Sequence, residues 1–149
     1  MSESEPVHIL LVEDNPGDIR LTEEAFKEQN IKNELHVTTN GAKALDFLHR
    51  RNGFEDAPRP DIILLDLNLP RMNGNEVLSR IREDEDELIK NVPVIVLTSS
   101  QAEEDVIQSY ELQANAFLTK PVDPIEFIDT IRTFRAFWLE IVRLPSGEV

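Results

Sequence analysis

Short continuous runs of aliphatic residues recur along the chain, and the stretches between them carry apolar residues at every third or fourth position. Runs of the first kind are typical of strands buried on both faces of a sheet, whereas the second spacing indicates amphipathic helices. The runs predict strands at 7–12, 34–39, 61–66, 92–97 and 116–119. The periodic stretches predict helices at 16–30, at 42–50, from residue 74 into the charged stretch 82–87, at 102–112 and at 124–142.

Residues that favour turns separate these elements. Asn15 can cap the first helix, with Pro16 in its first turn, and Asn40 belongs to an Asn-Gly turn before the second helix. Residues 51–60 contain Gly53, Pro58 and Pro60, which predict a loop. The charged stretch 82–87 is expected to form a solvated face.

The alternation of five strands with five helices predicts an α/β fold, in which a doubly wound parallel sheet is covered on both faces. No internal repeat or linker divides the pattern. We therefore expect one domain at 7–143, between a disordered acidic N-terminus at 1–6 and a flexible tail at 144–149. In sheets of this kind ligands bind beyond the carboxyl ends of the strands, so chemistry is expected in the residues that directly follow each strand.

Composition narrows the function. The chain has 149 residues, of which 40% are apolar, and it lacks cysteine, which excludes disulfides and thiolate metal sites. A formal net charge of −14 repels nucleic acid and anionic membranes. Apolar runs are far shorter than the roughly 20 residues that cross a bilayer, and the acidic start is unlike a secretory signal. We expect a cytoplasmic protein with no nucleic-acid or membrane partner. Its acidic, lysine-poor composition fits both a halophilic source and an ordinary acidic protein.

Polar residues follow four of the predicted strands. Glu13 and Asp14 follow the first, Asp66 ends the third, Thr98 follows the fourth and Lys120 follows the fifth. In a parallel sheet these ends meet at one edge, which would gather three carboxylates, a hydroxyl and an ammonium. Each residue alone has an ordinary explanation, as a helix N-terminus, a turn, a strand end or a surface charge. Their joint placement at strand ends favours a common site.

The predicted set of groups suits phosphoryl transfer. Three carboxylates repel one another unless a hard cation lies among them, and oxygen ligands with water suit Mg²⁺. One carboxylate can attack phosphorus, while the cation and the ammonium neutralise the phosphoryl oxygens. The hydroxyl can donate a hydrogen bond to a phosphoryl oxygen only when phosphate is present, as a switch requires.

Five sequence segments carry a resemblance to a known family, and together they are specific although each alone is weak. They are 9–15, 61–66, 69–74, 94–98 and 120–121, within a similarity that extends over residues 7–134. The chain resembles the receiver domain of two-component response regulators, with the flavodoxin-like fold of the chemotaxis regulators. The resemblance implies the strand order 2-1-3-4-5 and a phosphorylation switch that catalyses only its own phosphorylation and dephosphorylation.

The resemblance also implies a role for each site residue. Asp66 would be the phosphoacceptor, Asp14 a direct Mg²⁺ ligand, Glu13 a ligand through water, and the Asn68 backbone carbonyl a further ligand. Lys120 would pair with the phosphoryl group.

Three further features of the family fall on this sequence. Thr98 would be the switch hydroxyl, and the peptide bond between Lys120 and Pro121 would be cis. Phe117 stands at the position of the rotating aromatic, although plain core packing explains a Phe in this apolar strand equally well.

Within the family the chain looks closest to the small regulators of bacteriophytochrome-type histidine kinases. The signs are the longer loop at 51–60, the segment 66–70, and the tail 137–140 followed by Leu144 and Pro145. The implied partner is a sensor histidine kinase, of phytochrome type on the subfamily resemblance. After residue 121 the pattern shows one helix and a short tail, so we expect output through protein contact or phosphoryl relay rather than a DNA-binding domain.

The last predicted helix carries a coiled-coil-like apolar stripe that continues past the last strand. Large apolar groups exposed together usually mark an interface. We expect a homodimer through this helix, and the alternative is that the segment folds back on its own domain. The predicted interface residues are Phe134, Phe137, Trp138 and Ile141.

Three other functions were weighed. A Mg²⁺-dependent phosphatase of the haloacid-dehalogenase type needs a second Asp as general acid two residues after the nucleophile, and Asn68 stands there. A flavin carrier of the same fold class needs a glycine-rich, hydroxyl-rich phosphate loop, whereas the loop after the first strand is anionic. A phosphate-independent adaptor would not need the acidic pair, Asp66, Thr98 and Lys120 together.

Overall fold

The computed structural model describes residues 6–27, 32–98 and 103–132. A five-stranded parallel sheet forms its centre, with the strand order β2-β1-β3-β4-β5. The predicted fold class and strand order are thereby confirmed. The strands are β1 (Val7–Val12), β2 (Asn33–Thr38), β3 (Ile62–Asp66), β4 (Val94–Thr98) and β5 (Ala116–Thr119).

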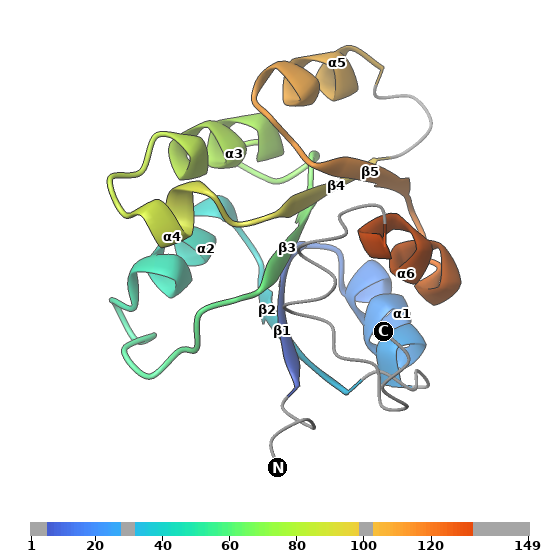
Figure 1. Ribbon diagram of the computed structural model, residues 1–149. Coiled ribbons are helices and arrows are strands. Elements are labelled where there is room, and N and C mark those ends of the chain that lie inside the picture. Colours follow the sequence, from blue (N-terminus) through green and yellow to red (C-terminus); the bar gives the residue numbers. More distant parts are fainter. Residues whose placement is uncertain (1–5, 28–31, 99–102, 133–149) are drawn as a thin grey trace.

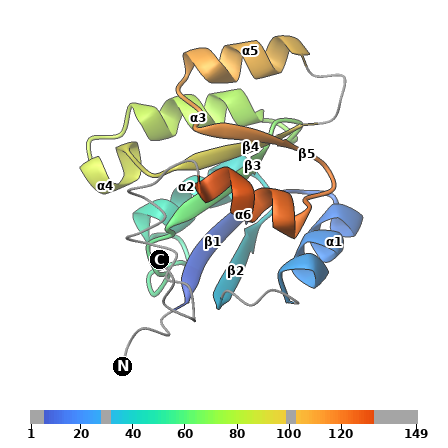
Figure 2. The ribbon, with the colours of Figure 1, turned by 45° about the vertical axis from the view of Figure 1, so that its right-hand side comes forward.

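Helices cover both faces of this sheet (Figures 1 and 2). Helices α1 and α6 lie together on one face, and α2, α3 and α5 cover the other. The helices are α1 (Pro16–Lys27), α2 (Gly41–His49), α3 (Gly74–Arg82), α4 (Glu87–Lys90), α5 (Glu103–Glu111) and α6 (Pro124–Arg132).

The core consists of two apolar layers, one on each face of the sheet. Successive strand residues point to opposite faces, so Leu10 packs in the layer under α2 and α3 while Leu11 packs in the layer under α1 and α6. Phe26 and Phe127 meet edge to face in the second layer, with ring centroids 4.9 Å apart. All residues of β3 and β4 are buried, as the continuous apolar runs predict.

The strand predictions agree with the structure to within two residues, and the 51–60 loop is confirmed as a segment of turns. The single helical turn α4, which Asp86 caps through the Leu88 N–H, was not predicted. The expectation that 82–87 is merely a solvated face is wrong for Arg82. Its half-buried guanidinium donates to the carbonyl oxygens of Lys90 and Val92 and to that of Gln113 beyond α5. Arg82 therefore ties three segments together at this end of the molecule.

The loop between β3 and α3 is held close to the sheet edge. Asn73 caps α3 by accepting a hydrogen bond from the Glu76 N–H at 2.9 Å. Gly74 then lies against the end of β3, where a Cβ atom would stand 2.5 Å from the Asp66 carbonyl oxygen. Only glycine allows this approach, so the residue fixes the start of α3 directly beside the candidate phosphoacceptor.

Two further sequence predictions concern a dimer interface and membrane-spanning helices. The predicted interface residues Phe134, Phe137, Trp138 and Ile141 all lie outside the described residues, so the homodimer stays a prediction. Within the described segments, none of the helices combines the length and apolar character that crossing a membrane requires.

Candidate functional site

The carboxyl edge of the sheet brings the predicted site residues to one place. Asp66 is the last residue of β3, and Glu13 directly follows β1; each is only 1% exposed. Asp14, the next residue, is exposed. Backbone hydrogen bonds continue past the strands here, because Glu13 N–H donates to the Thr38 carbonyl and Lys120 N–H donates to the Thr98 carbonyl. The side chains are therefore positioned by ordered backbone.

Lys120 links the acidic groups of this edge. Its ammonium donates to Glu13 Oε1 at 3.1 Å, to Asp66 Oδ2 at 3.2 Å and to Asp18 Oδ2 at 2.9 Å. The peptide bond between Lys120 and Pro121 is cis, as the resemblance implies. One cation thus contacts three carboxylates that come from two strand ends and from the first turn of α1.

Burial and crowding change the acidity of these groups. Burial, and next the neighbouring Asp66 charge, raise the pKa of Glu13 from its ordinary value of 4.5 to about 7. Burial alone would lower the pKa of Lys120, but the hydrogen bond to Asp18 and the charges of Asp66 and Glu13 outweigh it and raise that pKa. The site therefore keeps its ammonium firmly charged while it holds more negative charge than it can easily neutralise.

The remaining negative charge fits a divalent cation. Carboxylate oxygens of Glu13, Asp14 and Asp66 all lie within 4.8 Å of one another. Backbone N–H groups orient two of these side chains, since Asn15 donates to Glu13 Oε2 and Asn68 donates to Asp66 Oδ1. Exclusively oxygen ligands of this kind suit hard cations such as Mg²⁺ or Mn²⁺.

The two predicted switch residues lie on the neighbouring strands. Thr98 ends β4 and is buried, one residue beyond Leu97, which pairs with Asp66 across the sheet. Phe117 of β5 is half-buried and packs on the layer under α2 and α3, with its ring centroid 4.3 Å from that of Tyr110 in α5. The packing role of Phe117 is thus observed, and its role as a rotating switch stays a prediction.

Sequence reasoning missed two residues that shape this site. Asp18 reaches Lys120 from the first turn of α1, and its signal in the sequence was only an acidic residue in the first turn of the helix that follows the acidic pair. Gly74 brings α3 against Asp66, and its signal was a glycine directly after the capping Asn73.

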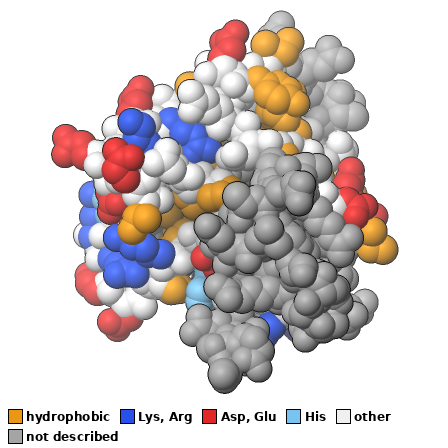
Figure 3. Space-filling model, viewed as in Figure 1, with side chains coloured by type: hydrophobic (Ala, Val, Ile, Leu, Met, Phe, Trp, Pro, Cys, Tyr) orange, Lys and Arg blue, Asp and Glu red, His pale blue; other side chains and the backbone are white. Residues whose placement is uncertain are grey.

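Two large apolar residues of α5 are exposed. Ile107 and Tyr110 are more than half exposed, at 61% and 62%. Figure 3 shows apolar side chains at the top of the molecule, where α5 lies, and acidic and basic side chains intermixed on the left. Tyr110 in turn contacts Phe117 of β5, with ring centroids 4.3 Å apart.

Comparison with known families and proteins gives a consistent result. Residues 9–132 match the response regulator receiver domain family. Response regulator Rcp1 of Synechocystis sp. is 45% identical over 142 residues, which cover 95% of each chain.

Solved structures agree with this match. The Mn²⁺-bound form of Rcp1 aligns with a TM-score of 0.73 over 94% of this chain and 99% of that one, at 45% identity. The bacteriophytochrome response regulator AtBRR aligns with a TM-score of 0.79 over 90% of this chain and 96% of that one, at 40% identity. The phosphorylated cyanobacterial phytochrome response regulator RcpA aligns with a TM-score of 0.74 over 95% and 99% of the two chains, at 38% identity.

Proposed function

The chain belongs to the response regulator receiver family, and from this premise we propose that Asp66 accepts a phosphoryl group from a sensor histidine kinase. A receiver takes its phosphoryl group on an aspartate, and the edge of this sheet presents several acidic candidates. The observation that favours Asp66 is its buried carboxylate, which accepts from Lys120 on one oxygen and from the Asn68 N–H on the other. Both oxygens are thereby oriented for attack.

The chemistry follows from these contacts. A carboxylate oxygen of Asp66 forms a bond to phosphorus while the bond from phosphorus to the donor nitrogen or oxygen breaks, which gives an acyl phosphate. The ammonium of Lys120 stays charged and can move from the carboxylates to the phosphoryl oxygens, since it already lies 3.2 Å from Asp66. Glu13 accepts hydrogen bonds from Lys120 and from the Asn15 N–H, and in this proposal it serves the cation rather than the phosphoryl group.

The carboxylates of Glu13, Asp14 and Asp66 would hold Mg²⁺, with the Asn68 carbonyl as a further ligand. Their proximity and their all-oxygen character support this assignment. When bound, the cation neutralises charge on the phosphoryl oxygens. A Mn²⁺-bound form is described for the relative Rcp1, which supports the binding of a hard divalent cation.

Thr98 and Phe117 would carry the signal from the phosphoryl group to the surface. A hydrogen bond from the Thr98 hydroxyl to a phosphoryl oxygen exists only after phosphorylation, and Phe117 lies on the adjacent strand against Tyr110 of α5. The exposed apolar residues of α5 suit a partner that recognises one of the two states.

The relatives extend the proposal to the partner. The neighbours AtBRR and RcpA are described as bacteriophytochrome and phytochrome response regulators, which supports a phytochrome-type kinase as the donor. We place this transfer in the cytoplasm as part of the proposal. A Mg²⁺-dependent phosphatase and a phosphate-independent adaptor are not favoured by the family match.

We also propose a homodimer through the segment after α6. The proposal of a dimer rests only on the row of apolar residues in the last predicted helix. Light scattering on the wild type and on the double variant Phe137→Ala/Trp138→Ala tests it. A wild type that stays monomeric at high concentration, with and without phosphorylation, would contradict the dimer.

Labelling with a small phosphodonor such as acetyl phosphate tests the phosphoacceptor. We expect Mg²⁺-dependent, alkali-labile labelling of the wild type and none of Asp66→Asn. Asp61→Asn is the matched control, because Asp61 is a half-buried carboxylate beside the opposite end of the same strand. Equal labelling of wild type and Asp66→Asn would overturn the assignment.

A further inference from the structure

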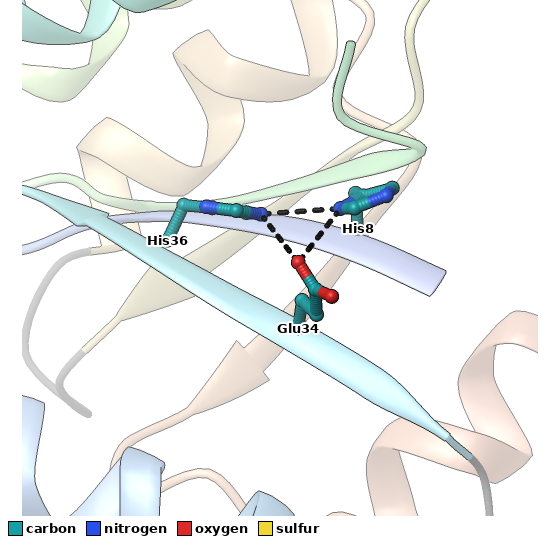
Figure 4. Close-up of side chains that lie close together, drawn as sticks. All are labelled: His8, Glu34 and His36. Atoms are coloured by element: carbon teal, nitrogen blue, oxygen red, sulfur yellow. Dashed lines mark hydrogen bonds and ion pairs between the residues drawn. The ribbon is translucent and has the colours of Figure 1, made fainter. Parts of the chain in front are cut away.

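A second group of potential ligands lies toward the amino end of β1 and β2. His8 of β1 pairs with Glu34 of β2, and His36 lies two residues further along the same strand. Because side chains two residues apart share a face, the three side chains point to one side of the sheet and converge (Figure 4). His8 Nδ1 lies 3.1 Å from His36 Nε2 and 3.6 Å from Glu34 Oε1, and His36 Nε2 lies 3.9 Å from that same oxygen.

We propose that His8, Glu34 and His36 bind a divalent transition-metal ion of the Zn²⁺ type. In tetrahedral Zn²⁺ sites with bonds of about 2.0–2.1 Å, ligand atoms lie about 3.3–3.4 Å apart. The three observed separations bracket this value, so shifts of a few tenths of an ångström would bring all three atoms into coordination. Glu34 is more than half exposed, which leaves the fourth position open to water.

The donor atoms select this class of ion. Two imidazole nitrogens and one carboxylate suit Zn²⁺, Co²⁺ and Ni²⁺, whereas the all-oxygen carboxyl edge suits Mg²⁺. Imidazole must be neutral to coordinate, and burial, followed by the neighbouring His8, lowers the pKa of His36 below its ordinary 6.5.

The surrounding groups hold the ligands and offset charge. The His36 ring packs against the Phe47 ring of α2 at 5.5 Å, and the two imidazoles stack at 5.3 Å. Asp61 accepts a hydrogen bond from the backbone N–H of His8 at 2.8 Å, so a second carboxylate lies beside the cluster. Glu34 and Asp61 together would balance the charge of a bound dication.

The site is separate from the carboxyl edge and has a different consequence. His8 and Val12 are four residues apart on β1, which corresponds to about 13 Å along a strand. A metal bound here would link the edge strand β2 to its neighbour β1, and it would leave the acidic cluster open. It would stabilise the pairing of β2 with β1 and would not take part in phosphoryl transfer.

Zn²⁺ titration of the untagged full chain in excess Mg²⁺, followed by calorimetry, tests the proposal, with the visible absorption of Co²⁺ as a spectroscopic check. The chain has three histidines, and the third, His49, pairs with Asp84 at 2.8 Å and provides the matched control. We expect the wild type and His49→Gln to bind one equivalent of Zn²⁺ with the same affinity. In His8→Gln and in His36→Gln the affinity for Zn²⁺ should fall by on the order of 100-fold or more. Asp14→Asn, at the acidic edge, should bind Zn²⁺ like the wild type.

Either of two results with the histidine and Asp14 variants would overturn the proposal. One is an unchanged Zn²⁺ affinity in the double variant His8→Gln/His36→Gln, and the other is a loss in Asp14→Asn, which would assign the ion to the acidic edge. If a histidine variant fails to fold, Glu34→Gln replaces it, because this exposed side chain can be changed without disturbing the core. Retained tight binding and an unchanged Co²⁺ spectrum in Glu34→Gln would also contradict the three-ligand site.

Discussion

The two ends of β1 both collect ionisable side chains, but they bury them to different extents and combine different atoms. At the carboxyl end, Glu13 and Asp66 are almost fully buried and share the ammonium of Lys120. At the amino end, the side chains of His8 and His36 are about one-quarter exposed and meet a single exposed carboxylate. The same parallel strands thus support an all-oxygen group of ligands that is crowded with negative charge and a second group in which two imidazoles accompany a carboxylate.

The two ends also differ in how many structural elements contribute their side chains. The carboxyl end draws its groups from the ends of three strands and the start of α1, so many elements must be in place before the site exists. The amino end needs only the pairing of two strands. Changes at the carboxyl end should therefore alter stability and function together, whereas changes at the amino end should leave phosphorylation unaffected.

The largest expected effect comes from the closest backbone approach at the carboxyl end. A side chain at Gly74 would collide with the Asp66 carbonyl and the Leu67 Cα, neither of which can move freely. Gly74→Val should lower the free energy of unfolding by on the order of 3 kcal/mol or more and displace the loop between β3 and α3. Denaturant unfolding measures the loss. Gly17→Ala is the control, where the nearest obstacle is an exposed side-chain oxygen at 3.2 Å, and a similar loss there would contradict the argument.

How far the sequence alone predicts these features depends on what brings residues together. The strands and the acidic edge follow from apolar runs that each end in a polar residue, because parallel strands place those ends at one edge whatever the details of pairing. The cluster of His8, Glu34 and His36 depends on register, and a slip of one residue between β1 and β2 would move the partners to opposite faces. The contact of Asp18 with Lys120 likewise depends on where α1 packs, which its own sequence does not specify.

The second prediction removes the shared cation of the carboxyl end. Lys120→Met leaves Glu13, Asp18 and Asp66 without their common partner, and should cost on the order of 2–3 kcal/mol of unfolding free energy without Mg²⁺. The raised pKa of Glu13 moderates the loss, since this group can take up a proton. Unfolding with and without Mg²⁺ measures it, and saturating Mg²⁺ should restore part of the stability. If Lys120→Met has wild-type stability in both conditions, the ammonium does not hold the carboxylates together.

A third prediction concerns the pH dependence of Mg²⁺ binding at the carboxyl end. At the proposed Mg²⁺ site the ionised form of the Glu13 carboxylate would contribute to binding, and protons would compete with the cation below the Glu13 pKa of about 7. Mg²⁺ affinity should therefore be constant above pH 7 and fall by up to about tenfold for each pH unit below it. Titrations at several pH values measure this slope, which Glu13→Gln should abolish. Glu13→Gln keeping the full slope between pH 7 and 5 would assign the proton to another group.

The smallest expected effect distinguishes two buried threonines at the carboxyl edge. Thr98 ends β4 and Thr38 ends β2; both are buried. The Thr38 hydroxyl has no hydrogen-bond partner among the described residues, whereas Thr98 directly follows Leu97, the residue of β4 that pairs with Asp66. A hydrogen bond from Thr98 to a charged phosphoryl oxygen is worth about 1–3 kcal/mol and exists in only one state. Thr98→Val should therefore still accept phosphate on Asp66. The equilibrium constant for the change of conformation that follows phosphorylation should fall by about tenfold or more.

Thr38→Val is the matched control, because it makes the same change in shape at the other strand end and removes a hydroxyl that lacks a partner. It should leave the phosphorylation-dependent change intact and keep or slightly raise the stability. Labelling with acetyl phosphate, together with amide chemical shifts of β5 and α5 before and after phosphorylation, measures both steps. If Thr98→Val blocks labelling itself, the hydroxyl acts in the chemistry rather than in the response. If both variants respond like the wild type, the signal leaves Asp66 by a route that does not use Thr98.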